Sequence, residues 1–257
     1  MFPVLIKLGP LTLRTYGLFV ALGFFAGLQY ILYQARKLNI DEGEILDVVL
    51  YAIVAGLVGG RLLYVILNWQ YYAGNFFQVF QIWEGGLVFY GGFFLSVAVV
   101  IVYAKKHKSF DLWDFSDITA PAICIGHFFG RLGCFFAGCC YGLPTDMPWA
   151  YTFTNPNALA PLHIALHPTQ VYEALGNLVI FFVLNFMLKH KHFSGQILAA
   201  YLFLYGILRF HVEFLRGDDR GGYLLGLSPS QMISIVFVTA AVAIIVKRKN
   251  NGKITNS

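Results

Sequence analysis

The chain has 257 residues, of which 58% are hydrophobic and 12% are charged, and its net charge is +5. Soluble domains contain about 45–50% apolar and about 25% charged residues, so this composition indicates an integral membrane protein. The positive charge does not indicate nucleic-acid binding, because the basic residues form short clusters between apolar runs. Clusters of this kind orient membrane helices and contact anionic lipid.

The chain opens with a short segment that is too broken to cross a membrane. Residues 2–14 alternate apolar and polar side chains around Pro3 and Pro10, which suits an interfacial segment lying on the membrane. The first long apolar run follows it. That run lacks a small-residue cleavage site and further runs come after it, so we expect a retained helix rather than a signal peptide.

Seven apolar runs occupy most of the remaining chain. Each is long enough to cross about 30 Å of hydrocarbon at about 1.5 Å per residue. They cover approximately residues 15–33, 45–67, 87–103, 118–140, 171–188, 197–215 and 229–246. We therefore predict an all-α, polytopic membrane protein with about seven transmembrane helices, forming a single domain over residues 1–257.

Lysine and arginine are concentrated in alternate connections, after the first, third, fifth and seventh runs. By the positive-inside rule, those connections face the cytoplasm. This places the N-terminus outside, the C-terminus in the cytoplasm, and the long proline-rich loop of about 141–170, which has no lysine or arginine, on the outer side. No repeat of 20–50 residues is visible, which counts against a transporter built from repeats.

A single arginine, Arg131, lies within the fourth apolar run. An arginine at that depth costs about 2.5–3.5 kcal/mol on insertion scales, so it is rarely retained for packing alone. We expect it to face a polar cavity and hold an anion; the alternative is a purely structural pair with a carboxylate. Glycines surround it and permit close approach of a backbone or a headgroup, at positions 126, 130, 133, 138 and 142.

The four cysteines all fall near Arg131: Cys124, Cys134, Cys139 and Cys140. The spacing C-x4-C-C is not a usual zinc pattern, and no histidine pair at ligand spacing accompanies it. We therefore expect no metal, and favour buried apolar thiols. A disulfide between Cys134 and Cys139 on an oxidising face remains open.

Other charged residues lie at a depth similar to that of Arg131. Arg209 and Glu213 are four residues apart and share one helical face, so they could form only an internal ion pair. Together with Arg61 and Arg131, however, there are three arginines in or near the outer halves of three runs. Only Glu213 and Glu173 balance them, which predicts a positive cavity for an anionic ligand of lipid origin.

The fifth run begins with a dense polar segment that includes His167, Gln170 and Glu173. A helix N-cap needs only one such group, whereas a helix start facing a headgroup uses several. Tyr16 and Tyr90 each stand beside glycine at the start of a run. On the residues alone, an interfacial aromatic belt explains both tyrosines.

The segment from Gly130 to Gly142 resembles the signature G-R-x-G-N-F-x-N-x-E-x-x-G of the prolipoprotein diacylglyceryl transferases. It matches that signature at the glycines, the arginine and Phe135. The similarity extends over nearly the whole chain, through blocks at residues 14–17, 85–92, 167–173 and 209–216.

Three departures from the family pattern matter. Cys134 stands for the signature asparagine, Cys139 for the glutamate, and Tyr90 for a histidine between paired glycines. A thiol donates only weakly and cannot supply a charged acceptor unless it is ionised. The resemblance therefore leaves open either a divergent active branch or a paralogue with another lipid or acceptor.

The resemblance implies an enzyme of the bacterial cytoplasmic (inner) membrane that needs no cofactor. It would transfer diacylglyceryl from phosphatidylglycerol to the lipobox cysteine of prolipoproteins, forming a thioether and releasing glycerol phosphate. This is the first step of bacterial lipoprotein maturation. The expected partners are phosphatidylglycerol, prolipoprotein signal peptides and membrane lipids, with no nucleic acid.

The resemblance also suggests roles for particular residues. Arg131 and Arg209 would offset the charge on the leaving phosphate, with Glu213 fixing the Arg209 fork. Tyr16 would position the donor headgroup, and Tyr90 is a hypothetical proton acceptor for the incoming thiol. The expected substrate-binding residues are Arg131, Gly142, Arg61, His167, Gln170, Glu173, Cys134 and Cys139.

Two readings from other classes compete with the transferase. A transporter or channel for an anionic solute would predict internal pseudo-symmetry, which the sequence lacks. A lipid-binding paralogue without catalysis would retain the arginines, so an arginine count cannot separate it from the enzyme. A binding assay without turnover would favour that second alternative.

Overall fold

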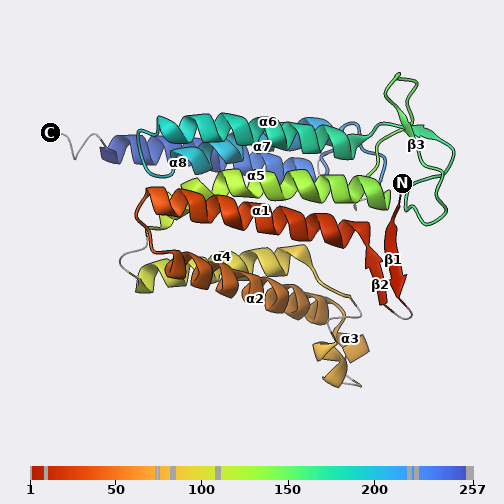
Figure 1. Ribbon diagram of the computed structural model, residues 1–257, viewed down its shortest axis with the longest axis horizontal. Coiled ribbons are helices and arrows are strands. Elements are labelled where there is room, and N and C mark those ends of the chain that lie inside the picture. The colour runs from red at the N-terminus through yellow and green to blue at the C-terminus, as the bar shows by residue number, and fades with distance from the viewer. Residues whose placement is uncertain are drawn as a thin grey trace. The chain divides into compact units, whose positions relative to one another are not determined.

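The computed structural model describes every residue except 1, 9–10, 73, 75, 82–84, 108–110, 219–221, 223–225 and 253–257 (Figure 1). The chain divides into two compact units. The first unit contains residues 1–31 and 116–257, and the second contains residues 32–115. The prediction of one domain over the whole chain stays a prediction.

Long helices form over all seven apolar runs. They are α1 (Thr15–Lys37), α2 (Glu42–Leu67), α4 (Phe89–Lys106), α5 (Leu112–Ala137), α6 (Thr169–Lys189), α7 (Gln196–Glu213) and α8 (Pro229–Gly252). Within the described residues, 6 of them are long and apolar enough to span a membrane. The exception is α7, whose last turns contain Arg209, His211 and Glu213. The prediction of an all-helical, multi-span membrane protein is confirmed.

Short elements complete the chain. Strand β1 (Val4–Leu8) pairs antiparallel with β2 (Leu11–Arg14), and β3 (Tyr151–Thr152) pairs with β4 (Ala165–Leu166) inside the predicted outer loop. The second unit adds the short helix α3 (Trp69–Tyr72) and the 3-10 helix η1 (Phe76–Phe80). The alternating pattern of residues 2–14 is thus that of a hairpin, and its membrane contact stays a prediction.

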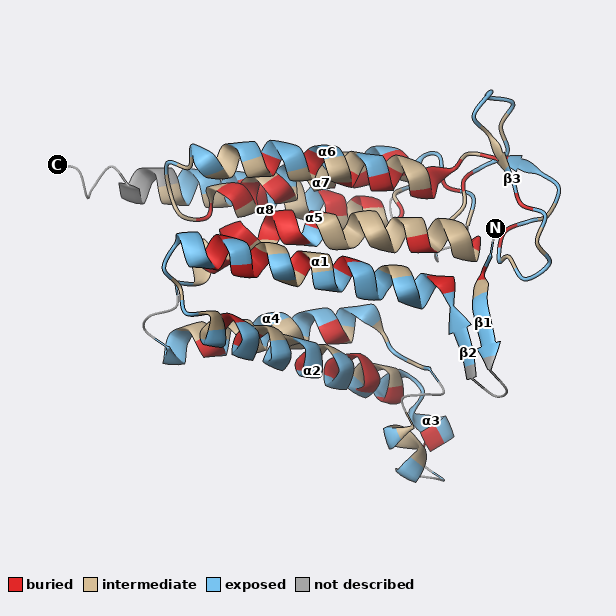
Figure 2. Cartoon of the chain, in the orientation of Figure 1, coloured by how far each residue is buried: buried red, intermediate tan, exposed pale blue. Residues whose placement is uncertain are grey.

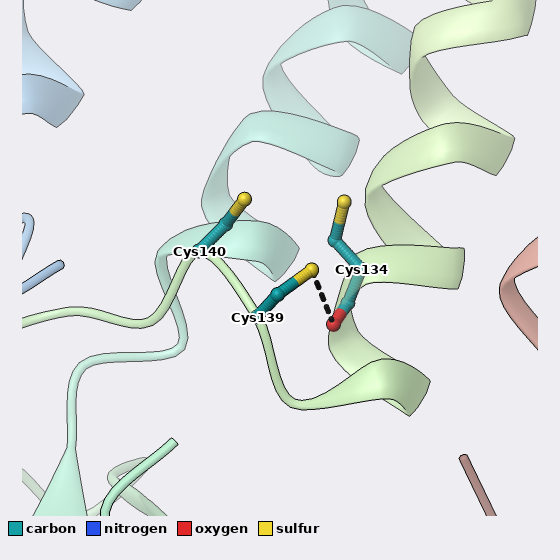
Figure 3. A group of neighbouring side chains, drawn as sticks. All are labelled: Cys134, Cys139 and Cys140. Atoms are coloured by element: carbon teal, nitrogen blue, oxygen red, sulfur yellow. Dashed lines mark hydrogen bonds between the residues drawn. The ribbon is translucent and has the colours of Figure 1, made fainter. Parts of the chain in front are cut away.

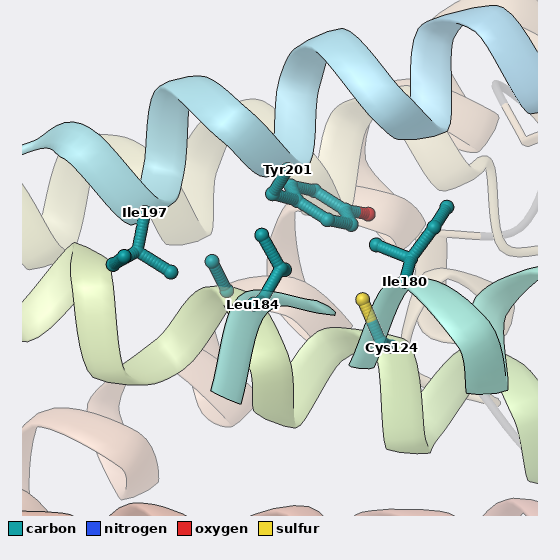
Figure 4. Packing of buried hydrophobic residues seen from close by; sticks show 6 residues of the cluster. Cys124, Ile180, Leu184, Ile197 and Tyr201 are labelled. Carbon is teal, nitrogen blue, oxygen red and sulfur yellow. The ribbon is translucent and has the colours of Figure 1, made fainter. Parts of the chain in front are cut away.

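The core of the first unit lies where α5, α6 and α7 pack together. Its buried side chains are Ala120, Cys124, Ile180, Leu184, Ile197 and Tyr201 (Figure 4). The outward side of α6 is also apolar: Val179, Phe182 and Phe186 are each more than 60% exposed. Figure 2 shows the resulting pattern of buried and exposed faces. Apolar side chains on the outside are expected where the surroundings are lipid.

One carboxylate joins two of these helices. Asp117 of α5 is 0% exposed, and its oxygens accept hydrogen bonds from the backbone N–H groups of Gly195 (2.8 Å), Ile197 (2.9 Å) and Leu198 (3.0 Å). Lys191 Nζ lies 3.1 Å from the same carboxylate. Because the first N–H groups of a helix have no partner within it, Asp117 caps α7 and fixes its start against α5.

Glycines set the packing of α2 against α4 in the second unit. A Cβ added at Gly59 would lie 2.4 Å from the Gly91 carbonyl oxygen, and one added at Gly91 would lie 2.3 Å from that of Gly59. The two backbones approach as closely as small residues allow in membrane helix pairs.

The buried arginine and glutamate side chains of the first unit gather at one of its ends. The last turn of α5, the first turn of α6, the last turn of α7 and the first turn of α8 meet there, next to the loop that contains β3 and β4 (Figure 1). An isolated bridge between Gly142 and Arg216 ties that loop to the residues after α7. This end of the first unit holds the candidate site.

Candidate active site

Glu173 lies at the centre of a buried charge cluster. Its side chain, on the first turns of α6, is 1% exposed. Arg131 of α5 forms an ion pair with it through Nε, and Arg209 Nη1 lies 3.1 Å from Oε1. Arg216 Nη1 is 4.0 Å from Oε2. One carboxylate therefore holds three guanidinium groups that come from separate segments.

A second carboxylate, Glu213, holds Arg209 from the other side. Arg209 Nη2 lies 2.6 Å from Glu213 Oε2, as expected for residues four apart on a helix, and it also donates to Ser230 Oγ at 2.8 Å. The hydroxyl of Ser228 donates to Glu213 Oε1 at 2.8 Å. The fork of Arg209 is therefore fixed between α6, α7 and α8.

A third carboxylate, Asp218, pairs with Arg216. Arg216 Nε and Nη2 donate to its two oxygens at 2.8 and 2.7 Å, which is the strong two-point geometry of arginine and carboxylate. Three arginines thus face three carboxylates among the described residues. The sequence predicted an excess of positive charge from Arg61, Arg131 and Arg209. That part is wrong for the described residues, because Arg61 belongs to the second unit and Arg216 enters the cluster together with a carboxylate partner, Asp218.

The first residues of α6 hold the loop that follows α5. Gln170 Nε2 donates to the Cys139 carbonyl at 2.7 Å, and Thr169 Oγ1 donates to the Cys140 carbonyl at 2.8 Å. Both side chains are fully buried. The polar start of α6, predicted to face a headgroup, thus also serves to fix the backbone of the two cysteines.

Gly142 lies where three segments meet. A Cβ at this position would stand 2.6 Å from the His167 carbonyl oxygen and 2.7 Å from that of Leu215, so no side chain fits. Its N–H donates to the His167 carbonyl at 3.0 Å. The ring of His167 is in turn 3.1 Å, through Nδ1, from the hydroxyl of Tyr172. Gly142 thereby lets the loop run directly beside the end of α7.

The cysteines are free thiols in two different environments. Cys124 is buried in the helical core, as predicted, whereas Cys134, Cys139 and Cys140 are only partly buried. The last three place their sulfur atoms within 4.8 Å of one another (Figure 3). Hydrogen bonds from the thiols of Cys134 and Cys139, and after them the charge of Arg216, lower the pKa of the Cys140 thiol.

Tyr16 stands at the start of α1, close to the end of α5. A Cβ at Gly133 would lie 3.2 Å from its ring and 3.1 Å from Phe19 Cβ, so the glycine lets the two helices approach. The Tyr16 side chain is 44% exposed and lies on the polar end of the first unit.

Two predicted site residues, Arg61 and Tyr90, belong to the second unit. Arg61 is 5% exposed and donates to backbone carbonyls of the segment before α4, at Gln78 (2.6 Å), Gly85 (2.7 Å) and Val79 (2.8 Å). In this position it fixes that segment against α2. Tyr90, on the first turn of α4, is 46% exposed and contacts Phe89 edge to face.

Four residues of the site were not predicted from the sequence: Arg216, Asp218, Ser228 and Ser230. A signal existed for Ser228, since S-P-S-Q before an apolar run is a capping box. The structure contains this box: the Ser228 N–H donates to Gln231 Oε1 at 3.0 Å, and the Gln231 N–H donates to Ser228 Oγ at 3.2 Å. The cap therefore fixes the serine that holds Glu213.

The chain is similar in sequence to known proteins over nearly its full length. The family model of the prolipoprotein diacylglyceryl transferases matches residues 3–247. The chain is 39% identical over 235 residues to a phosphatidylglycerol–prolipoprotein diacylglyceryl transferase of Finegoldia magna, covering 91% of this chain and 90% of that protein. The enzymes of the same name from Clostridium tetani and Streptococcus pneumoniae are 36% and 35% identical. Those two alignments cover 94% and 95% of this chain and 96% and 93% of theirs.

Proposed function

The chain belongs to the prolipoprotein diacylglyceryl transferase family, and on that premise we propose that it lipidates prolipoproteins. The sulfur of a lipobox cysteine attacks the carbon of the diacylglyceryl group that bears the phosphate of phosphatidylglycerol. The carbon–oxygen bond to phosphate breaks, a thioether forms, and glycerol phosphate leaves with the bonding electrons. The thiol proton is lost to a base, so atoms and charge balance.

The proposed setting is the bacterial cytoplasmic (inner) membrane, with the loop of about 141–170 on the outer side. The partners are phosphatidylglycerol, the signal peptides of prolipoproteins and the surrounding lipids. The reaction breaks and forms single bonds without electron transfer, so we propose that it needs no redox cofactor.

The buried arginine cluster carries this proposal. Negative charge develops on the leaving phosphate, and fixed guanidinium groups in a site sheltered from water stabilise that charge more than water does. Arg131 and Arg209 are the proposed catalytic arginines. Each already has its fork oriented by carboxylates, Arg131 by Glu173, and Arg209 by Glu173 and Glu213. These carboxylates hold each guanidinium fork in one orientation before the phosphate arrives.

The other site residues have proposed roles that follow from their places. Tyr16, exposed near the end of α5, positions the donor headgroup. His167, Gln170 and Gly142 shape the loop that borders the headgroup. The roles of Tyr90 as proton acceptor and of Arg61 in substrate binding stay predictions from the sequence.

Reconstitution tests the reaction directly. The purified chain in proteoliposomes receives phosphatidylglycerol and a synthetic lipobox peptide, and mass spectrometry follows the diacylglyceryl addition to the peptide cysteine. We expect turnover by the native chain. Arg131→Ala should lower the rate by about 10²–10³-fold, which is the usual cost of removing one such donor. Arg131→Lys should retain only part of the native rate, because an ammonium group lacks the planar fork of a guanidinium group.

A matched control is available in Arg36→Ala. Arg36 is 62% exposed and pairs with Glu42, which is also exposed, so its loss should leave the rate unchanged. Full activity of Arg131→Ala would contradict the site assignment. No turnover by a native chain that still binds phosphatidylglycerol would instead favour a paralogue with another acceptor, which the three departures from the family pattern allow.

A further inference from the structure

Three thiols that are separated by the spacing C-x4-C-C converge at the end of α5. Cys134 lies in the last turn of the helix, and Cys139 and Cys140 lie in the loop after it (Figure 3). All three sulfur atoms lie within 4.8 Å of one another. The Cys139 thiol also donates to the Cys134 carbonyl at 3.7 Å, which holds the loop back against the helix.

These separations suit a common thiolate-bound ion. Zinc–sulfur bonds are about 2.3 Å long, so sulfurs that share a tetrahedral zinc stand about 3.8 Å apart. The sulfur atoms now lie within 4.8 Å of one another, so the widest separation would shorten by about 1 Å on binding zinc. Soft d10 cations such as Zn²⁺ are the ions that thiolate ligands prefer.

The backbone is arranged to bring the third sulfur into the cluster. Adjacent side chains on an extended chain point to opposite sides, so neighbouring cysteines do not normally share a site. Cys140 has φ +61°, a left-handed conformation that residues with a Cβ rarely adopt. This turn directs the Cys140 side chain toward the other two. The left-handed conformation of Cys140 thus accompanies the convergence of the three sulfurs.

The ligand loop is also held rigidly from outside. Thr169 and Gln170 bind the carbonyls of Cys140 and Cys139, and both side chains are fully buried. Rigid support of this kind keeps ligands in place before an ion arrives. Three thiolates and one divalent ion carry a net charge of −1. The Arg216 guanidinium lies beside Cys140 as well as pairing with Asp218, so it attracts that charge.

We propose that Cys134, Cys139 and Cys140 form a binding site for one thiophilic divalent d10 cation of the Zn²⁺ class. Three protein ligands leave the fourth tetrahedral position open for water or another small ligand, the arrangement of reactive rather than purely structural zinc sites. The spacing alone indicated no metal, because it lacks the usual separation between ligand pairs. The proposal does not depend on the transferase reaction.

Metal titration tests the site without reference to turnover. The full chain, with any purification tag removed, is reduced, stripped of metal and titrated with Zn²⁺ against a chromogenic chelator. Cd²⁺ is then used to detect sulfur-to-metal charge-transfer absorption. We expect one ion per chain. Changing any of the three cysteines to serine should weaken binding by at least about 100-fold, since even the loss of an outer-shell partner costs about 10–100-fold.

The matched control is Cys124→Ala, which removes the fourth cysteine from the helical core and should bind the ion as the native chain does. A native chain that takes up no Zn²⁺ overturns the proposal. So does a triple serine variant that binds as tightly as the native chain, because the ion would then lie elsewhere.

A second measurement uses only the native chain, so it tests the site even if the cysteine variants fold poorly. The reduced protein is treated with iodoacetamide with and without Zn²⁺, and mass spectrometry identifies the alkylated cysteines. We expect Zn²⁺ to protect Cys134, Cys139 and Cys140 together, and a chelator to restore their alkylation. Equal alkylation of the three thiols in both conditions contradicts a shared site.

Discussion

At the scale of single residues, Glu173 is the side chain that pairs with all three arginines of the cluster, Arg131, Arg209 and Arg216. Burial of a carboxylate costs desolvation free energy, and the ion pairs with three guanidinium groups offset that cost here. Removing one member of such a cluster is more harmful than its net contribution suggests, because the remaining charges lose their partner while they stay buried.

Glu173→Gln should therefore destabilise the protein by about 3–5 kcal/mol, the usual loss when one partner of a buried ion pair is removed. The neutral amide keeps the size of the side chain, so the effect would be electrostatic. Chemical unfolding in detergent measures it. Asp218→Asn is the comparison, because the Asp218 side chain is 19% exposed and that of Glu173 is 1% exposed. If the two variants are equally stable, Glu173 is not the centre of the cluster.

The sequence predicted part of this site. The pairing of Arg209 with Glu213 followed from helical spacing, and Arg131 stood out as a charge in an apolar run. The contact of Arg131 with Glu173 was not predictable, because it joins α5 to α6 and depends on how those helices pack. Asp218 was missed as a partner for the same reason, since its role depends on where the chain turns after α7.

At the scale of elements, the cap from Asp117 links α5 to the start of α7. Asp117→Ala would leave three backbone N–H groups of the α7 start without their acceptor. We expect a loss of about 1–2 kcal/mol in unfolding free energy, as for other caps. Asp117 is fourteen residues before Arg131 in α5, so turnover by the folded variant should be unchanged. Asp117→Asn, which keeps an acceptor oxygen, should lose less; an equal loss would indicate that the Lys191 pair dominates.

The glycine contact between α2 and α4 gives another prediction. Gly91→Ala places a methyl group against the Gly59 carbonyl, and that backbone atom cannot move aside easily. Overpacking of this kind costs about 1–3 kcal/mol. Thermal unfolding in detergent would show the loss. The control is Gly126→Ala, because a Cβ at Gly126 meets nothing within 4 Å. A stable Gly91→Ala variant would mean that the helix pair is looser than described.

The apolar runs predicted where the helices lie, but the start of α5 was predicted too late because its first turns are polar. The fourth apolar run begins at Ile118, whereas α5 begins at Leu112. Asp114 and Asp117 lie in those extra turns and interrupt the run. The helix starts earlier because Asp111 accepts a hydrogen bond from the Asp114 N–H at 2.8 Å. Local capping therefore extended the helix beyond its hydrophobic part.

At the scale of the whole molecule, the orientation in the membrane remains a prediction from the distribution of lysine and arginine. Asn157 and His192 are exposed positions on connections that we expect on opposite sides. In intact cells, a membrane-impermeant thiol reagent should label Asn157→Cys. It should label His192→Cys only after permeabilisation. Labelling of the native chain gives the background, and the reverse result would invert the topology.

The pairing of every arginine in the cluster with a carboxylate changes what anion binding means in this protein. The arginines are not vacant receptors, because Glu173, Glu213 and Asp218 already act as resident counterions. An arriving phosphate must compete with these carboxylates, so its binding is an exchange of one anion for another. Measured lipid affinity will then report the difference between two sets of ion pairs. A weak affinity for lipid is therefore compatible with strong individual contacts. The carboxylates can also re-form their ion pairs with the arginines as the product leaves, which favours product release.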